Sequence, residues 1–193
     1  MGYTTLLVLD VQNGVTDIFG KSLLDPYLKR LSATLSAARE EEDINIIHVV
    51  TGYRPYYPEC HPSNSTLPAI ILAGKFQEGA KDVQIHPRVT PLRDEPVIVK
   101  RRVSAFIGTE LDMLLRCSTT DHLAIAGIAT SGAVLSTIRH AQDLDYKITV
   151  LRDLCLDRDE EVHRFLIQKI FSGKMDVLDS REWIKQMKVH KSA

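Results

Sequence analysis

The chain lacks several features that define whole classes of protein. None of its apolar stretches approaches the roughly 20 residues needed to cross a bilayer, which argues against a membrane protein. It has almost no charge imbalance, with a formal net charge of -1, so neither nucleic acid nor an anionic membrane surface is favoured as a partner. Its three cysteines are widely spaced and odd in number, which fits a reducing compartment better than a disulfide framework.

What remains is the composition of a globular domain. The chain is 44% hydrophobic and 25% charged, and its 193 residues suit one domain with a sizeable core. No repeat, low-complexity segment or interdomain linker interrupts it, so we expect residues 1–193 to form a single domain. The first residues show no charged leader followed by an apolar segment, so we expect a cytoplasmic location.

Short segments rich in Val, Ile and Leu alternate with segments of helical period. Four of the short segments are almost continuously apolar, as in a parallel sheet covered by helices on both faces. Strands that alternate with helices imply right-handed crossovers. The sequence therefore predicts the α/β class: a three-layer α/β/α, Rossmann-like domain with a six-stranded parallel sheet. The predicted strands are Thr4–Leu9, Ile44–Val50, Val97–Lys100, His122–Gly127, Ile148–Leu151 and Met175–Leu178.

Three segments between or after these strands carry apolar residues at helical spacing. The first helix is expected to begin at Asp25-Pro26, an N-cap followed by proline in the first turn. The last is expected to begin with a capping box formed by Asp157 and Glu160. The apolar stripes are Leu28, Leu31, Leu35 and Ala38; Val134, Ile138, Ala141 and Leu144; and Val162, Phe165, Leu166 and Ile170.

The stretch from Thr51 to Pro96 breaks this alternation. It carries Tyr53, Tyr56 and Tyr57 and is rich in proline and glycine. A loop of this length inside a compact domain is usually functional. We therefore expect it to cover a site or to form a subunit contact.

Polar residues stand where the predicted strands end. Asp10 follows the first strand, Thr51 follows the second, Lys100 closes the third, and the turn after Ile128 opens a helical segment. Ligands bind beyond the carboxyl ends of the strands in open parallel sheets, which groups these positions. A carboxylate and an ammonium group that meet in a cleft can exchange protons, and the N–H groups that open a helix suit an oxyanion. From the pattern alone, the alternative is a loop-capping aspartate and a solvated lysine.

Three motifs follow one another along the chain. They are Leu9-Asp10-Val11-Gln12-Asn13; Lys100 with Ser104-Ala105-Phe106 and Thr109-Glu110-Leu111; and Gly127-Ile128-Ala129-Thr130. Together they resemble the isochorismatase-like hydrolases, a superfamily of nicotinamidases, N-carbamoylsarcosine amidases and isochorismatases. The resemblance implies a small-molecule substrate, no cofactor, and a homo-oligomer that is a dimer or a tetramer.

For the amidase branch, the resemblance implies a triad of Asp, Lys and Cys. Asp10 and Lys100 match the first two members, and Ala133 stands at the position of the cysteine. A methyl group cannot attack a carbonyl, so thiol-based amide hydrolysis is not expected. By the same resemblance, the Ile128–Ala129 peptide bond would be cis, and the backbone N–H groups of Ala129 and Ala133 would form an oxyanion hole.

True isochorismatases in this superfamily also lack the cysteine, and they hydrolyse a vinyl ether. The resemblance then implies that Asp10 is a general acid that protonates the vinyl carbon, after which water adds to the oxocarbenium ion. Cations would hold the substrate carboxylates, and the available cations are Lys100, Arg101, Arg102 and Arg54. The residues expected to contact the substrate are Gln12, Arg54, Ser104, Phe106, Thr130, Ser131 and Gly132.

Two alternatives stay open. A catalytically silent binding protein would keep the pocket without the chemistry. An amidase would instead use Ser131 or Cys155, although Ser131 is equally an N-cap and a free cysteine is usually packed among apolar groups. No metal is expected, because the Asp-x-His motif of metal-dependent nicotinamidases reads Thr51-Gly52-Tyr53 here, and His61 and His86 are scattered.

Overall fold

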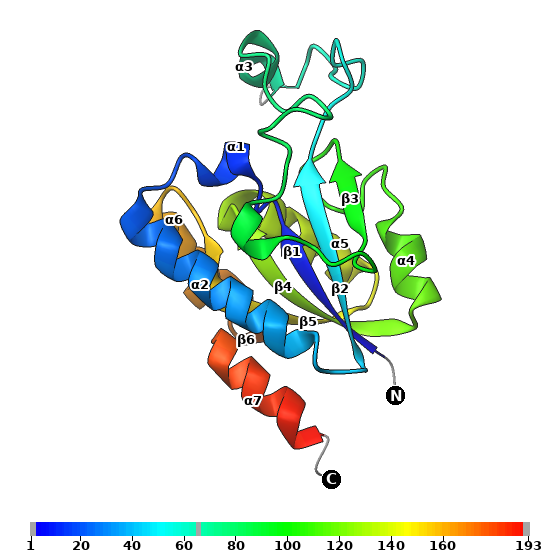
Figure 1. Ribbon diagram of the computed structural model, residues 1–193, viewed down its shortest axis with the longest axis vertical. Coiled ribbons are helices and arrows are strands. Elements are labelled where there is room, and N and C mark those ends of the chain that lie inside the picture. Colours follow the sequence, from blue (N-terminus) through cyan, green and yellow to red (C-terminus); the bar gives the residue numbers. More distant parts are fainter. Residues whose placement is uncertain (1–2, 65–66, 191–193) are drawn as a thin grey trace.

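A single parallel sheet forms the centre of the fold. The computed structural model describes residues 3–64 and 67–190. All six strands run in the same direction, in the order β3-β2-β1-β4-β5-β6, which confirms the predicted fold class (Figure 1). The strands are β1 (Tyr3–Leu9), β2 (Ile44–Thr51), β3 (Val97–Lys100), β4 (Thr120–Ile128), β5 (Lys147–Leu156) and β6 (Asp176–Leu178).

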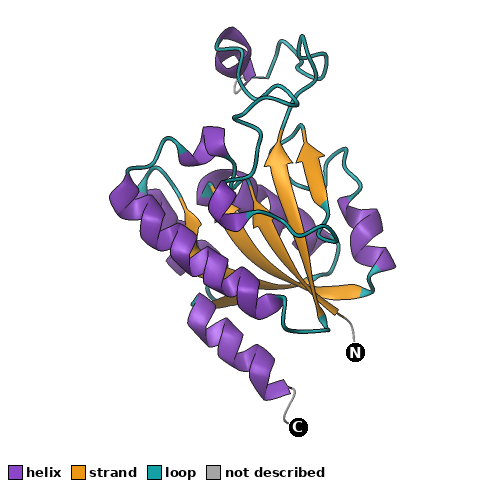
Figure 2. Ribbon diagram, viewed as in Figure 1, coloured by secondary structure: helices purple, strands orange, loops and turns teal. Residues whose placement is uncertain are grey.

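Helices cover both faces of the sheet and give the expected three layers (Figure 2). Helices α2 and α7 pack on one face, and α4, α5 and the π-helical segment η3 pack on the other. Within the part of the chain that the structure describes, no helix is long and apolar enough to cross a membrane. The helical elements are α1 (Asn13–Thr16), α2 (Lys21–Ala38), α3 (Leu67–Leu72), η1 (Pro87–Val89), α4 (Leu111–Cys117), η2 (Thr130–Val134), α5 (Leu135–Asp143), α6 (Glu160–Phe165), η3 (Leu166–Phe171) and α7 (Ser180–His190).

Strand β1 lies in the middle of the sheet and divides the core into two halves. Leu6 and Val8 pack with the helices on the α2 face, and Leu7 and Leu9 pack with the helices on the α5 face. This alternation follows from the two-residue period of a strand, and both faces are apolar because β1 is covered on both sides. The end of β1 is therefore fixed at the centre of the carboxyl edge of the sheet.

Strands β1 and β4 approach each other closely at Gly127. This residue has a φ of +147°, and a Cβ placed on it would lie 2.3 Å from the carbonyl oxygen of Leu9. Only glycine fits such an approach. The close contact brings the end of β4, and the turn that follows it, beside Asp10.

Several strand boundaries shift from the prediction by one or two residues, and two boundaries, the end of β5 and the start of α2, differ by more. Strand β5 continues to Leu156 rather than ending at Leu151, because a register shift lets Cys155 pair with Gly127 of β4. Helix α2 begins at Lys21 with Gly20 as its N-cap, so the predicted start at Asp25-Pro26 is wrong. Pro26 lies inside the helix, where its missing N–H removes one backbone hydrogen bond near the helix start.

The start of α6 also differs from the prediction. The carboxylate of Asp159 caps the helix by accepting hydrogen bonds from the N–H groups of Glu161 and Val162, so a capping box of Asp157 and Glu160 is wrong. Two residues of the predicted stripe, Val162 and Phe165, are exposed, because the apolar side chains that reach the core come from η3. The stripes of α2 and α5 are buried as predicted, with Leu144 only partly so.

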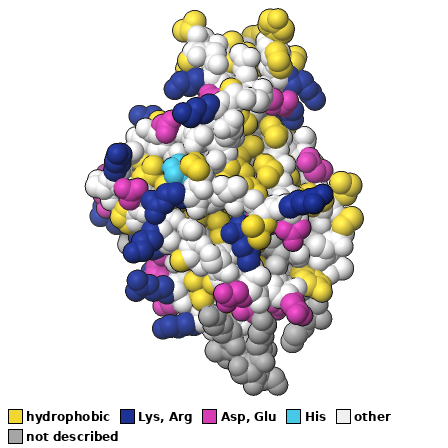
Figure 3. All heavy atoms as spheres, in the orientation of Figure 1, with side chains coloured by type: hydrophobic (Ala, Val, Ile, Leu, Met, Phe, Trp, Pro, Cys, Tyr) yellow, Lys and Arg dark blue, Asp and Glu magenta, His cyan; other side chains and the backbone are white. Residues whose placement is uncertain are grey.

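The segment from residue 52 to residue 96 is here called the arm. Its first part, which carries α3, projects beyond the carboxyl ends of β2 and β3, and its last part returns along the domain, where η1 packs against α2 (Figure 1). It carries α3 and η1, and a small cluster of Tyr53, Tyr57 and Leu67 is buried within it. Apolar side chains are exposed at its end (Figure 3). Tyr56 and Leu72 are the most exposed large apolar residues of the arm among those that the structure describes. A subunit contact made by the arm stays a prediction.

Candidate active site

A buried ion pair lies at the centre of the carboxyl edge of the sheet. Asp10 directly follows β1 and Lys100 ends β3, and the two residues are only 6% and 2% exposed. Lys100 Nζ lies 2.8 Å from Asp10 Oδ2. The backbone of Asp10 has a φ of +53°, a left-handed conformation that non-glycine residues adopt mainly in turns and functional sites. The two charges that the sequence placed at separate strand ends therefore meet.

Thr51, the last residue of β2, bridges the two charges. Because β2 lies between β1 and β3, Lys100 has to reach across one strand to meet Asp10. Its Nζ donates a hydrogen bond of 2.7 Å to Thr51 Oγ1, and Thr51 Oγ1 donates one of 3.0 Å to Asp10 Oδ1. The hydroxyl thus forms a continuous hydrogen-bonded path between ammonium and carboxylate. The sequence placed Thr51 at this edge but gave no sign of this bridging role.

The side chain of Gln12 fixes the position of Thr51 through hydrogen bonds to its backbone. Its side chain accepts a hydrogen bond of 2.6 Å from the N–H of Thr51 and donates bonds of 3.0 Å to the carbonyl oxygens of Thr51 and Asp82. The residue is fully buried and lies outside the cavity described below. Gln12, predicted to contact the substrate, instead fixes the end of β2 and ties the arm to the sheet.

A cavity of about 170 Å³ lies over the ion pair. Ala133 of η2 lines it together with Asp10 and Lys100, so the methyl group shares the cavity with both charges. The arm contributes apolar and aromatic groups, and burial raises the pKa of Tyr53 to about 12, which keeps its phenol protonated. The arm therefore covers the site, one of its two predicted roles. The other lining residues are Thr51, Asn64, Leu67, Ile70, Arg101, Arg102 and Val103.

The turn between β4 and α5 is clamped by two polar residues from the chain after β5. The Ile128–Ala129 peptide bond is cis, as expected. The carboxylate of Asp157 accepts a hydrogen bond of 2.7 Å from the N–H of Ser131, and His163 Nδ1 lies 2.8 Å from Thr130 Oγ1. Thr130 is fully buried. These clamps hold the backbone that carries Ala133, and the predicted oxyanion hole of Ala129 and Ala133 stays a prediction.

The predicted cations fall into two groups. Arg101 and Arg102 line the cavity, whereas Arg54 is exposed and pairs with Glu59 at 3.0 Å. The Glu59 carboxylate also binds Arg101 at 2.9 Å. Burial opposes the charge of Glu59, but hydrogen bonds from the backbone and from Arg101 hold its pKa below the usual value. Arg102 donates only to the carbonyl oxygens of Arg101 and Glu59, so its positive charge stands without a carboxylate partner among the described residues.

Ser104 and Phe106 lie outside the cavity and anchor the loop after β3. Ser104 Oγ accepts a hydrogen bond from the N–H of Phe106, and the ring of Phe106 stacks on His140 of α5 with centroids 4.9 Å apart. Between them, the N–H of Ala105 donates to Thr137 Oγ1 of α5. The segment Ser104–Phe106 therefore fixes the loop that carries Arg101 and Arg102. Ser131 and Gly132, two other residues expected to contact the substrate, also lie outside the cavity lining.

The geometry gives no support to Ser131 or Cys155 as a nucleophile. Cys155 is 1% exposed inside the core, and burial raises the pKa of its thiol to about 12. Ser131 is exposed, and no histidine in residues 3–64 and 67–190 hydrogen-bonds to it. The imidazoles of His61 and His86 each accept a hydrogen bond from a backbone N–H two residues later. No group of three or more His, Cys, Asp or Glu in those same ranges is placed to hold a metal ion.

Comparisons with known proteins identify the family. Residues 4–182 match the isochorismatase domain. The chain is 32% identical over 170 residues to the ureidoacrylate amidohydrolase RutB of Cronobacter sakazakii. This alignment covers 78% of this chain and 73% of that protein. A crystal structure of a cysteine hydrolase from Pseudomonas syringae pv. phaseolicola has a TM-score of 0.87 at 21% identity, over 96% of this chain and 92% of that chain.

A second solved structure, the N-carbamoylsarcosine amidase of Thermoplasma acidophilum, has a TM-score of 0.74 at 21% identity, over 92% of this chain and 96% of that chain. Identities this low show the shared fold alone. The domain match and the bacterial relative go further, and they agree with the Asp10–Lys100 pair at the carboxyl edge of the sheet. This chain is a member of the isochorismatase family of hydrolases.

Proposed function

We propose that this protein is a cysteine-independent hydrolase that cleaves a small anionic metabolite at a vinyl ether bond of the isochorismate type. The observation that carries the proposal is the Asp10–Lys100 ion pair in one cavity with Ala133, where a thiol would otherwise stand. The pair can supply and recover a proton, whereas the methyl group offers no nucleophile. Hydrolysis then has to proceed by proton transfer and attack of water.

The proposed reaction begins with the proton shared by the ion pair. Lys100 passes a proton to Asp10 over the 2.8 Å contact, and Asp10 delivers it to the terminal vinyl carbon. Water adds to the resulting oxocarbenium ion and gives a hemiketal, and the proton released by that water returns to Lys100. The hemiketal collapses to an alcohol and a ketone, so one water is consumed and the two side chains end as they began. Thr51 holds the carboxylate by its second oxygen, Oδ1.

The lining of the cavity supports a small anion as the substrate. About 170 Å³ is below the range of sites for drug-sized ligands. Arg101 and Arg102 bring positive charge to its wall, and only Arg101 is paired with carboxylates. Leu67 and Ile70 of the arm supply an apolar surface. A compact carboxylate with an apolar body matches this combination.

Two other functions are tested by the same experiment. The relationship to RutB favours hydrolysis of a ureido or amide compound, for which Asp10 would act as a base toward water. A silent binding protein would keep the cavity and perform neither reaction. Purified protein is incubated with isochorismate and with ureidoacrylate, and products are followed by chromatography. Release of pyruvate from isochorismate supports the proposal. Isochorismate that stays intact in the presence of the folded protein contradicts it.

Two variants sharpen the assignment. Asp10→Asn keeps the shape of the site and should lose at least 100-fold in turnover, on the order expected for a missing general acid, while ligand-induced thermal stabilisation is retained. Ala133→Cys restores a thiol in the cavity and should create alkylation-sensitive amide hydrolysis, with Ala133→Ser as the matched control for size. Full turnover in Asp10→Asn would show that the acid has been assigned to the wrong residue.

A further inference from the structure

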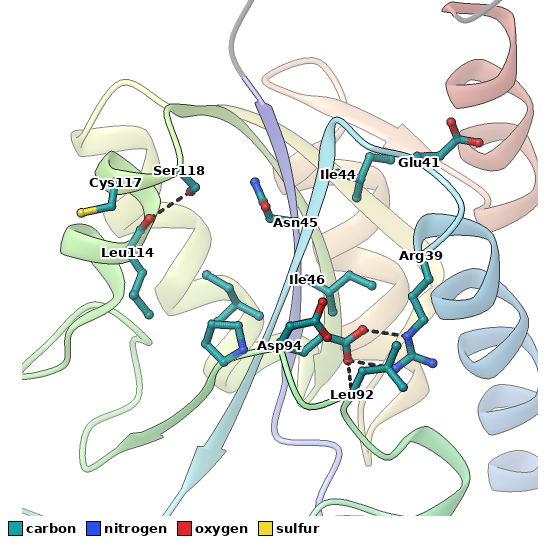
Figure 4. Close-up of a pocket in the computed structure, with 13 residues that line it drawn as sticks. Arg39, Glu41, Ile44, Asn45, Ile46, Leu92, Asp94, Leu114, Cys117 and Ser118 are labelled. Carbon is teal, nitrogen blue, oxygen red and sulfur yellow. Dashed lines mark hydrogen bonds and ion pairs between the residues drawn. The ribbon is translucent and has the colours of Figure 1, made fainter.

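A second hollow lies at the other end of β2, away from the ion pair. It has a volume of about 500 Å³ and is bounded by α4, the C-terminus of α2 and the segment Leu92–Pro96 (Figure 4). Its base is the first half of β2, residues 44–47. At about 3.3 Å per residue, this part of the strand starts roughly 20 Å from Thr51, so the hollow is separate from the candidate active site. We call it the edge groove.

The edge groove exists because β3 is short. Pairing between β2 and β3 begins only at His48 and Val97, so Ile44–Ile47 have no neighbouring strand on that side. Pro96 precedes β3, and proline has no N–H to extend the ladder. The vacant length is four residues, or about 13 Å of strand.

Backbone groups of Ile46 point into this vacancy. The N–H of His48 donates to Pro96 and that of Gly52 donates to Lys100, so even-numbered residues of β2 bond toward β3. The odd-numbered residues bond toward β1, as the contact between the Asp10 N–H and the Val49 carbonyl shows. Ile46 therefore turns both its N–H and its C=O toward the edge groove. The β2–β3 ladder begins only at His48, so neither group is bonded to β3. No loop backbone group among the described residues bonds to them either.

The sides of the edge groove are polar and carry a net negative charge. The amide of Asn45 lies between β2 and α4, near Ser118 (Figure 4). Arg39 is neutralised by two hydrogen bonds to Glu95, at 2.7 and 2.9 Å. Asp94 is exposed, and its carboxylate forms no hydrogen bond or ion pair with the described residues. It interacts with Arg39 only through longer-range electrostatics, so a negative charge stays available at the groove.

We propose that the edge groove binds an extended peptide segment of three or four residues that carries a basic side chain. An extended chain presents a C=O and an N–H on one edge, which is the complement that the two free groups of Ile46 require. Its added strand occupies the place left vacant by the short β3. The basic side chain pairs with Asp94. An open strand edge of this kind is a site where proteins recruit partner strands.

The test uses the ¹⁵N-labelled full chain and the peptide acetyl-Val-Ile-Val-Lys-amide, which has the sequence of β3 and so already pairs with β2 in this protein. Saturable shifts of the Ile46 amide signal and slower hydrogen exchange at that amide are expected. Binding should also slow alkylation of Cys117, an exposed thiol that lines the groove, whereas the alkylation rate of Cys60, a partly buried thiol outside the groove, should not change. An Ile46 amide that is unaffected at saturating peptide overturns the proposal.

Matched controls separate strand pairing from adsorption. The same peptide with N-methylated amides keeps its side chains but loses its donors, so it should bind at least ten-fold more weakly. Asp94→Asn should weaken binding at least three-fold, whereas Asp143→Asn, at the exposed C-terminal end of α5, should leave it unchanged. Equal binding of the N-methylated peptide means apolar adsorption and refutes the proposal. Protection of the Ile46 amide that rises with protein concentration, without peptide, assigns the groove to a second copy of this chain and also refutes it.

Discussion

The Asp10–Lys100 pair should behave as a strongly coupled unit in unfolding experiments. The two charged groups are 2.8 Å apart and almost completely buried. At an effective dielectric constant of about 20, their gross attraction is about 6 kcal/mol, and the desolvation of both groups offsets much of it. Removing one partner leaves the other charge buried and uncompensated, which costs about 3–5 kcal/mol.

The perturbation is a double-mutant cycle with Asp10→Asn, Lys100→Met and the double variant. Each single variant should lower the free energy of unfolding by about 3–5 kcal/mol, whereas the double variant leaves no isolated charge and should lose much less than the sum. We expect a coupling energy of at least about 2 kcal/mol between the two sites. Urea unfolding at pH 7, followed by circular dichroism, measures all three variants against the unmodified chain.

An exposed ion pair provides the control for this cycle. Arg88 and Asp25 lie 3.0 Å apart, but their side chains are 41% and 62% exposed. Solvent screens this pair, so the corresponding cycle should give a coupling below about 1 kcal/mol. Additive losses at Asp10 and Lys100, or single-variant losses as small as those of the surface pair, would refute the view that the two charges are buried in contact.

Three further predictions concern the core. Gly127→Ala should lower the free energy of unfolding by more than about 2 kcal/mol in urea titrations, because the new Cβ would lie 2.3 Å from the Leu9 carbonyl oxygen and the φ of Gly127 is positive. A loss below about 0.5 kcal/mol would contradict the close approach of β1 and β4. Burial lowers the pKa of His48, so the neutral form is favoured in the folded state. The stability contributed by neutral His48 is present above pH 6.5 and falls as the pH drops below that value. The urea midpoint of the unmodified chain should therefore decrease from pH 7 to pH 5.5, and the decrease should be smaller in His48→Gln. A decrease of the same size in His48→Gln would show that His48 does not cause it. Native protein should react with a thiol reagent at exposed Cys117, and Cys155 should react only in denaturant; rapid native labelling of Cys155 would show that it is accessible.

The sequence alone determined the class of the fold and the main members of the site. Uninterrupted apolar segments that alternate with helical stripes permit little other than a covered parallel sheet, and all six predicted strands exist. The positions of Asp10 and Lys100 at strand ends, and of Ala133 in the turn after β4, followed from the same pattern and from the family motifs. Local signals were weaker at element boundaries, since Gly20 rather than Asp25 caps α2 and Asp159 rather than Asp157 caps α6.

Only the tertiary structure decided which motif residues face the cavity and which support it. Gln12, Ser104 and Phe106 belong to the motifs, yet these partners lie 34 to 70 residues away along the chain, and no local pattern encodes such contacts. The same holds for Thr51, whose hydroxyl joins two charges only because β2 is placed between β1 and β3. The edge groove, too, depends on where β3 begins to pair with β2. Sequence spacing fixes what lies along one strand, whereas strand order and register fix what lies across it.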